Sequence, residues 1–251
     1  MFKKAFQKFA TLPYGVKVAS AGWLAFSATH LTLSHPPVRE KMIDFCGNQT
    51  NFRIIYGTIA TAIAGTTVLL YSRTPPSLRG KIVHNLYRRR NDTQSSSIGF
   101  RASVLLQAVG AFFVTDSYVT AYRNPLAMTD SEPKDPRSIR RMYQIAGLQR
   151  ITRHHEFFGY VFFALGSMLA NNRVGDMILY GFIPVFTAAG IIHQEYRLRQ
   201  TKPAFYFEDT SIIPFQAVLE GKQSLTKALF EVSPASYAAT FCVISMMFFW
   251  P

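Results

Sequence analysis

The fold class of this chain is decided by residues 54–71, IIYGTIATAIAGTTVLLY, an apolar run without one charged side chain. A helix needs about 20 such residues, within a range of about 17–25, to cross the hydrocarbon core of a bilayer. The runs at 99–122 and 174–194 also meet this length, and the run at 16–33 comes close to it. We expect two shorter runs, 157–171 and 237–250, to be tilted, half inserted or buried among other helices.

These runs predict an all-α fold: an integral membrane helical bundle of about six transmembrane or membrane-embedded helices. The composition agrees, since 49% of the residues are hydrophobic and only 16% are charged, against about a quarter charged in soluble domains. A soluble bundle with a very apolar core is the alternative. Small residues in two of the runs would let helices approach closely in lipid; they are Gly57, Ala60, Ala64, Gly65, Ala102, Ala108 and Gly110.

The net charge of +13 comes from 27 Lys and Arg against 14 Asp and Glu. Two basic blocks, at 73–101 and 123–153, suit anionic lipid head groups such as cardiolipin. They lack the interleaved aromatic residues of single-strand binders, so we expect no nucleic acid partner. The charge is spread nearly evenly over both sides of the predicted helices, which leaves the orientation open. The side chains expected to contact lipid or a partner are Arg88, Arg89, Arg90, Arg140 and Arg141.

The N-terminus, residues 1–15, is predicted to form an amphipathic interfacial helix that precedes a membrane domain at 16–251. Three lysines lie beside its apolar face, and no acidic residue occurs before Glu40. A basic, acid-free amphipathic segment suits a membrane interface and also has the character of an organellar import signal. It favours the mitochondrial inner membrane, with a plastid membrane as the alternative.

Three further segments have a predicted structure. Thr74-Pro75-Pro76-Ser77 should end the second helix, because Pro cannot continue it. Residues 140–153 interleave apolar residues with Arg and Gln, which predicts an amphipathic helix. Residues 212–221 are apolar but too short to span, so we expect them to lie along the membrane surface.

His30 is the clearest candidate for chemistry, because an ionisable residue inside a membrane segment is expensive to keep. A hydrogen bond to a neighbouring helix is the structural alternative. His154 and His155 open the fourth run, and Asp116 lies deep in the third, where we expect a structural pair with Arg101 or a loop arginine. Two intramembrane histidines on different helices can hold a haem iron, but the residues alone offer no obvious second ligand at the depth of His30.

A family resemblance adds to this interpretation. The stretch Arg150-Ile151-Thr152-Arg153-His154, a following Gly159 and Leu169-Ala170-Asn171 resemble the NnrU family of membrane proteins, which carries T-R-H-P and L-A-H-x-L-A-N-G. The early segment agrees through His30, Pro37-Val38-Arg39, Gly47, Phe52-Arg53 and Tyr56. The C-terminal part resembles the zeta-carotene isomerase branch of this family, through Thr210–Phe215, Ala217, Glu220-Gly221, Gln223 and Leu225.

The resemblance implies a multi-helix membrane fold. In the isomerase branch it implies haem b held between two histidines. The first ligand corresponds to His30, and the T-R-H-P histidine corresponds to His154, although His155 replaces the Pro. The second ligand position, in L-A-H-x-L-A-N, holds Ser167. Because a hydroxyl cannot replace imidazole as a strong iron ligand, the resemblance puts bis-histidine haem in doubt.

Two hypotheses follow. The first is a non-catalytic accessory subunit of a larger organellar complex of the respiratory-chain type, without a cofactor and in contact with membrane lipids and other subunits. The second is a haem b-dependent isomerase or redox protein acting on a polyene or isoprenoid lipid, with His30 and His154 as the candidate haem residues.

Overall fold

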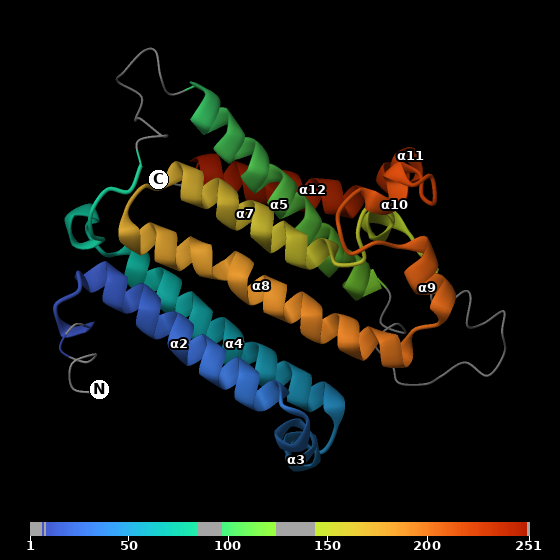
Figure 1. The fold of residues 1–251 in the computed structure, drawn as a ribbon, viewed down its shortest axis with the longest axis horizontal. Coiled ribbons are helices and arrows are strands. Elements are labelled where there is room, and N and C mark those ends of the chain that lie inside the picture. The colour runs from blue at the N-terminus through green and yellow to red at the C-terminus, as the bar shows by residue number, and fades with distance from the viewer. Residues whose placement is uncertain (1–6, 8, 85–96, 124–143, 250–251) are drawn as a thin grey trace. The chain divides into compact units, whose positions relative to one another are not determined.

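The computed structural model describes residues 7, 9–84, 97–123 and 144–249, and these residues are predominantly helical (Figure 1). Within them there is no β-strand, only an isolated antiparallel bridge between Ile82 and Arg173. The all-α class is therefore confirmed. In chain order the elements are α2 (Tyr14–Ser34), α3 (Pro36–Cys46), α4 (Gln49–Ser72), η1 (Pro76–Leu78), α5 (Ser97–Arg123), η3 (Gly147–Arg150), α7 (His155–Ala170), α8 (Val174–Thr201), α9 (Ala204–Asp209), α10 (Gln216–Leu219), α11 (Leu225–Glu231) and α12 (Pro234–Phe249).

Three described helices are long and apolar enough to cross a membrane: Gln49–Ser72, Ile98–Thr120 and Val174–Gln200. They correspond to the three longest apolar runs, as expected of a multi-pass membrane protein. A fourth span results if α11 and α12, which are bent by 82°, are taken together. The described residues thus supply three to four candidate spans. Because α7 and α12 have only 16 residues each, neither qualifies as a span on its own, and the count of about six transmembrane or membrane-embedded helices stays a prediction.

The chain divides into two compact units, and unit 1 comprises residues 1–91 and 171–182. Here α2 and α4 lie side by side (Figure 1), and a Cβ on Gly22 would come within 2.2 Å of the Thr67 Oγ1. As predicted, α4 ends before the Pro75-Pro76 pair. In the last turn of α4, the Tyr71 hydroxyl donates a 2.7 Å hydrogen bond to Asp176, whose carboxylate also lies 3.6 Å from the Arg79 guanidinium. These polar contacts join the start of α8 to the end of α4.

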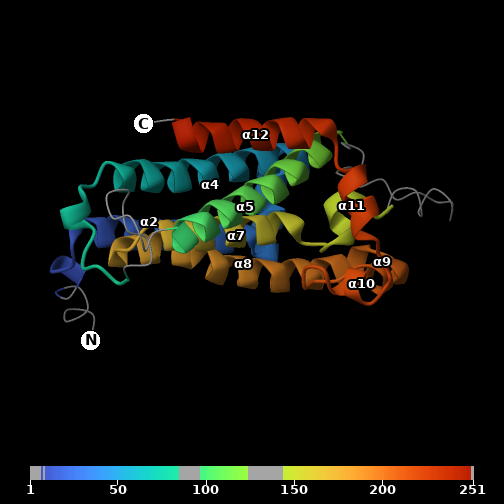
Figure 2. The same ribbon diagram turned by 90° about the horizontal axis from the view of Figure 1, so that it is seen from above.

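Unit 2 comprises residues 92–170 and 183–251, and its centre is the contact between α5 and α7, with α12 alongside α5 (Figure 2). Small residues seven positions apart make this contact: Ser103 and Gly110 on α5, Gly159 and Gly166 on α7. A Cβ on Gly110 would lie 2.5 Å from the Phe163 backbone nitrogen, and one on Gly166 would lie 2.7 Å from the Ser103 carbonyl oxygen. The two backbones approach this closely because glycine carries no side chain.

The predicted amphipathic helix at 140–153 is wrong within its described part, residues 144–153, which contain only the short 3-10 helix η3. Gly147 adopts a left-handed φ of 56°, which an α-helix does not tolerate. Backbone groups that would have bonded within a helix bond elsewhere: the Gly147 N–H donates to the Glu231 carboxylate, and the Ile151 carbonyl accepts from the Phe215 N–H. This stretch is therefore a connector fixed by the C-terminal segment.

Candidate functional site

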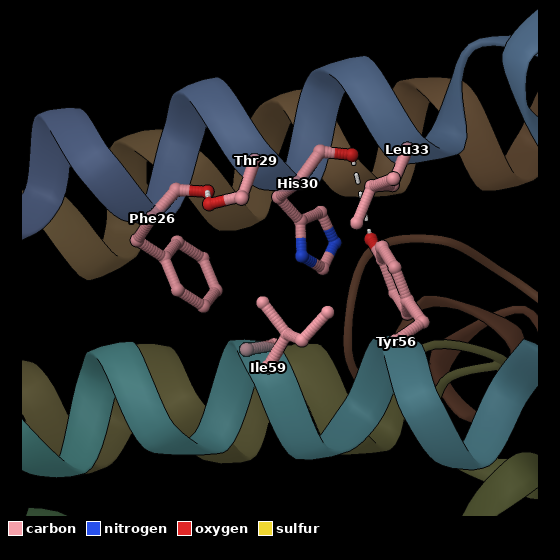
Figure 3. Close-up of a pocket in the computed structure, with 7 residues that line it drawn as sticks. Phe26, Thr29, His30, Leu33, Tyr56 and Ile59 are labelled. Atoms are coloured by element: carbon pink, nitrogen blue, oxygen red, sulfur yellow. Dashed lines mark hydrogen bonds between the residues drawn. The ribbon is translucent and has the colours of Figure 1, made fainter.

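His30 lies on α2 in unit 1, and its ring extends towards α4 between two aromatic rings (Figure 3). The Phe26 ring stacks on it with centroids 5.1 Å apart, and the Tyr56 ring lies at 4.8 Å. The Tyr56 hydroxyl also donates a long hydrogen bond, 3.5 Å, to the His30 carbonyl oxygen. The α2–α4 pair therefore holds this histidine in a defined aromatic setting.

The pocket beside His30 is small. It has a volume of about 160 Å³, part of it open, and it is lined by Phe26, Thr29, His30, Leu33, Tyr56, Ile59 and Ala60. Cofactor and ligand sites enclose about 300–1,000 Å³. A haem macrocycle would have to displace the rings on either side of His30, so the residues around this histidine do not fit haem as they are arranged.

Ser167 lies on α7 in unit 2, at the contact with α5. Its hydroxyl donates to the Phe163 carbonyl at 2.8 Å, and its side chain is buried. The adjacent Gly166 packs against Ser103 and Gln107 of α5, and the Ser103 hydroxyl donates to the Gly166 carbonyl at 2.8 Å. The position that carries a histidine in the related motif is thus filled by tight helix–helix packing.

His154, in the turn before α7, belongs to a buried ionic cluster. Its Nε2 lies 2.7 Å from the Glu195 carboxylate on α8, and the Arg153 Nε donates to the same carboxylate at 2.6 Å. Arg153 also donates to the carbonyl and hydroxyl oxygens of Thr210. The side chains of Arg153 and Glu195 are only 6% and 11% exposed. The cluster ties the start of α7, the end of α8 and the segment after α9 together.

A second, more open ion pair extends this connection. The Arg150 guanidinium donates to Glu231 of α11 at 2.7 and 2.8 Å and to the Gln223 side chain at 2.6 Å. The Glu231 hydrogen bond raises the pKa of Arg150 above its ordinary value. Sequence reasoning identified His154 but missed Glu195 and Glu231, since each lies far along the chain from its arginine. The sequence signal for Glu195 was its position as an acid directly after the apolar run at 174–194.

The two histidines at the start of α7 have incomplete hydrogen bonding. The His154 Nδ1 and both ring nitrogens of His155 are buried, and none of the three finds a hydrogen-bond partner among the described residues by geometry. Burial lowers the pKa of His154, outweighing the opposite effect of the Glu195 hydrogen bond, and lowers the pKa of His155 to about 4. Both rings are therefore neutral at physiological pH.

Replacing His155 with Pro is expected to leave the protein as stable as before or slightly more stable. His155 is the first residue of α7, where Pro is favoured because the missing N–H has no helical partner. The substitution also removes a buried imidazole whose ring nitrogens are poorly satisfied within the described part of the chain. Unfolding in mixed micelles should show a change below about 1 kcal/mol. His154→Ala, by contrast, should lose about 1.5–3 kcal/mol with its bond to Glu195. Equal losses in the two variants would contradict this account.

Stability should fall as the pH drops below 6.5, the ordinary pKa of histidine. Between that pH and about 4 the unfolded chain binds protons that the folded chain does not, since burial lowers the pKa of both rings. Above 6.5 the histidine contribution should be constant. The double variant His154→Gln, His155→Pro should flatten this part of an unfolding-versus-pH curve measured beside the parent chain, whereas superimposable curves would refute it.

The remaining predicted positions have mixed outcomes. Asp116 is buried and accepts a 2.8 Å hydrogen bond from the Ser236 hydroxyl of α12, rather than pairing with Arg101. The close α5–α12 contact supplies this neutral donor, and a pair with a loop arginine within residues 124–143 stays a prediction because those arginines lie outside the described residues. His30 belongs to unit 1 and His154 to unit 2. The five arginines assigned to lipid or partner contact lie outside the described residues, as do residues 1–6 and 8 of the predicted N-terminal helix; these arginines are Arg88, Arg89, Arg90, Arg140 and Arg141.

The chain was compared with models of known protein families, with curated proteins and with solved structures. A family model described as NnrU protein matches residues 19–250, which is nearly the whole chain. The matched region includes His30, helix α12 and the ionic cluster that precedes α7. No curated protein and no solved structure matches the chain. The chain therefore belongs to the NnrU protein family.

Proposed function

We propose that this protein is a non-catalytic accessory subunit of a larger membrane complex, of the respiratory-chain type, in the mitochondrial inner membrane. The observation that carries the proposal is the environment of Ser167. Where the related motif has a histidine, this chain has a serine whose hydroxyl donates to the Phe163 carbonyl of its own helix. The contact between α5 and α7 at this position is too tight for a cofactor. A member of the family that packs its helices tightly but lacks this iron-binding histidine is suited to a structural role.

Two further features support a structural role. Two arginine–glutamate pairs, Arg153–Glu195 and Arg150–Glu231, fix the connector that precedes α7. They link this connector to α8 and to α11. Such a framework makes a rigid surface rather than an opening site. The basic, acid-free N-terminal sequence supports the mitochondrial assignment, and the basic blocks suit cardiolipin, which is anionic.

Native electrophoresis tests the proposal. The full chain, tagged at its C-terminus and expressed at its native level, would be extracted from isolated mitochondria in mild detergent. We expect it to migrate within one assembly much larger than its own 28.3 kDa, with a constant set of co-purifying proteins. Monodisperse migration of the chain alone, in the same detergent that keeps the other respiratory complexes intact, would overturn the proposal.

The alternative, a haem b-dependent isomerase or redox protein, is favoured by one observation: His30 is a buried-facing imidazole in an aromatic pocket on a membrane helix. An absorption spectrum of the purified chain separates the alternatives. A stoichiometric haem band that disappears in His30→Ala but persists in His35→Ala would support the alternative.

Ser167→His tests whether the lost ligand position can still accept a cofactor. We expect the variant to bind no haem and to lose about 1–3 kcal/mol of stability, because the larger side chain overpacks the α5–α7 contact. Haem titration and unfolding in mixed micelles give the two readouts. Ser245→His, on a partly exposed position of α12, is the control for introducing histidine into an apolar helix. Tight haem binding by Ser167→His alone would mean that the pocket persists.

A further inference from the structure

Residues 211–231, here called the interfacial segment, contain α10, α11 and the loops beside them. The segment exposes large apolar side chains although it is too short to span a membrane. Leu219 and Phe230 are 86% and 85% exposed, and Ile213 is 63% exposed. Large apolar side chains that gather on one exposed segment, rather than being scattered singly, mark a surface that contacts a membrane or a partner. These exposed apolar side chains are therefore expected to contact either lipid or another protein.

The exposure does not come from loose attachment. Glu231 binds Arg150 and the Gly147 N–H, while Gln223 links Arg150 to the Asp209 carbonyl. The Phe215 N–H donates to the Ile151 carbonyl at 2.9 Å. Polar anchors thus fix the segment against the rest of unit 2.

The anchoring also fixes which way the apolar side chains point. Ala228 of α11 is fully buried, and Phe230, two residues on, lies about 200° around the helix axis. The side of α11 that faces the protein is therefore nearly opposite the side that carries Phe230. The outward direction of Phe230 follows from the fold itself.

The connection to α12 places this outward side at a bilayer boundary. Only Val232 and Ser233 separate α11 from α12, and the two helices meet at 82°. With α12 inserted into the hydrocarbon core along the bilayer normal, the 82° bend places α11 almost in the membrane plane. An in-plane helix with an apolar outer side suits the boundary between head groups and acyl chains.

We propose that the interfacial segment is a membrane-surface anchor, with Ile213, Leu219 and Phe230 inserted among the upper acyl chains. Its charged residues are two acids and two bases: Glu220, Lys222, Lys227 and Glu231. The balance of charge means that attraction to anionic lipid is not required, so a zwitterionic bilayer is sufficient. The Lys222–Glu220 pair, 2.7 Å apart and exposed, stays among head groups or water.

Spin-label accessibility in phosphatidylcholine nanodiscs tests the anchor. Single cysteines at Phe230→Cys and Leu219→Cys, in a chain with Cys46→Ser and Cys242→Ser, would each carry a nitroxide. Lys222→Cys is the matched control on the same segment, and Leu69→Cys on α4 is the lipid-facing reference. All are exposed positions, so the fold should persist.

We expect collisions with oxygen to exceed collisions with an aqueous nickel chelate at Phe230 and Leu219, by a ratio several-fold higher than at Lys222. Adding anionic lipid should not change that ratio. Preferential collision with the nickel chelate at both positions would overturn the proposal in favour of water exposure. Shielding from both reagents would overturn it in favour of a protein partner. Neither result depends on whether the chain migrates in a large complex, so the anchor and the proposed function fail separately.

Discussion

Glu195→Gln is expected to destabilise the protein by about 3–5 kcal/mol, because it removes the counter-charge of a buried arginine. Arg153 would keep its hydrogen bonds to Thr210 but would lose the carboxylate 2.6 Å away. His154 would lose the charged partner of its Nε2. The loss should appear as a lower free energy of unfolding in mixed micelles, and as earlier proteolysis of the segment around Thr210.

The matched control is Glu220→Gln, which removes the same charge from an exposed pair with Lys222. Exposed pairs contribute little to stability, because water screens them and long side chains lose freedom to form them. A Glu195→Gln loss no larger than that of Glu220→Gln would show that the cluster before α7 does not hold its three segments together.

The sequence predicts the spans of this fold better than its connectors. Run length alone identifies Gln49–Ser72, Ile98–Thr120 and Val174–Gln200, because crossing a bilayer imposes a length and an absence of charge that are visible locally. The connector at 144–153 shows the opposite. Its apolar spacing suits a helix, but its backbone bonds to residues some 60–80 positions away, such as Phe215 and Glu231. No local pattern contains those partners.

Small residues give a similar lesson. Gly110 was expected to mediate helix contact and does so, against Phe163 and Gly159. Gly57 and Gly65 were expected to do the same on α4, yet a Cβ on either would meet no described atom within 4 Å. The sequence shows at which positions of a helix a second helix can pack closely. Whether a second helix packs at a given position depends on the packing of the whole unit.

The candidate site was predictable in its residues but not in its surroundings. The family motif points to His30, His154 and Ser167, and each is partly or fully buried. Burial, however, has a different meaning at each position: an aromatic sandwich at His30, an ionic cluster at His154 and a helix contact at Ser167. Of these three environments, the sequence indicates only a change at Ser167, where a hydroxyl replaces the imidazole of the family motif.

Gly110→Leu should lower stability by about 3 kcal/mol or more, the upper part of the range for overpacking. The first added carbon would lie 2.5 Å from the Phe163 nitrogen and 2.7 Å from the Gly159 oxygen, both backbone atoms. Backbone cannot turn aside as a side chain can, so α5 and α7 must separate. That separation would also break the bond between the Ser103 hydroxyl and the Gly166 carbonyl.

Gly57→Leu is the control, since it introduces the same side chain into another candidate span where no described atom lies within 4 Å. Its effect should range from none to a gain of about 1 kcal/mol, from the better helix propensity of Leu. The two variants have the same composition and apolar content, so membrane insertion and detergent binding cancel in the comparison. If both lose stability equally, glycine is needed for helix flexibility. If only Gly110→Leu loses stability, the α5–α7 contact is what requires glycine, and this tight contact is the same one that leaves no room for a cofactor at Ser167.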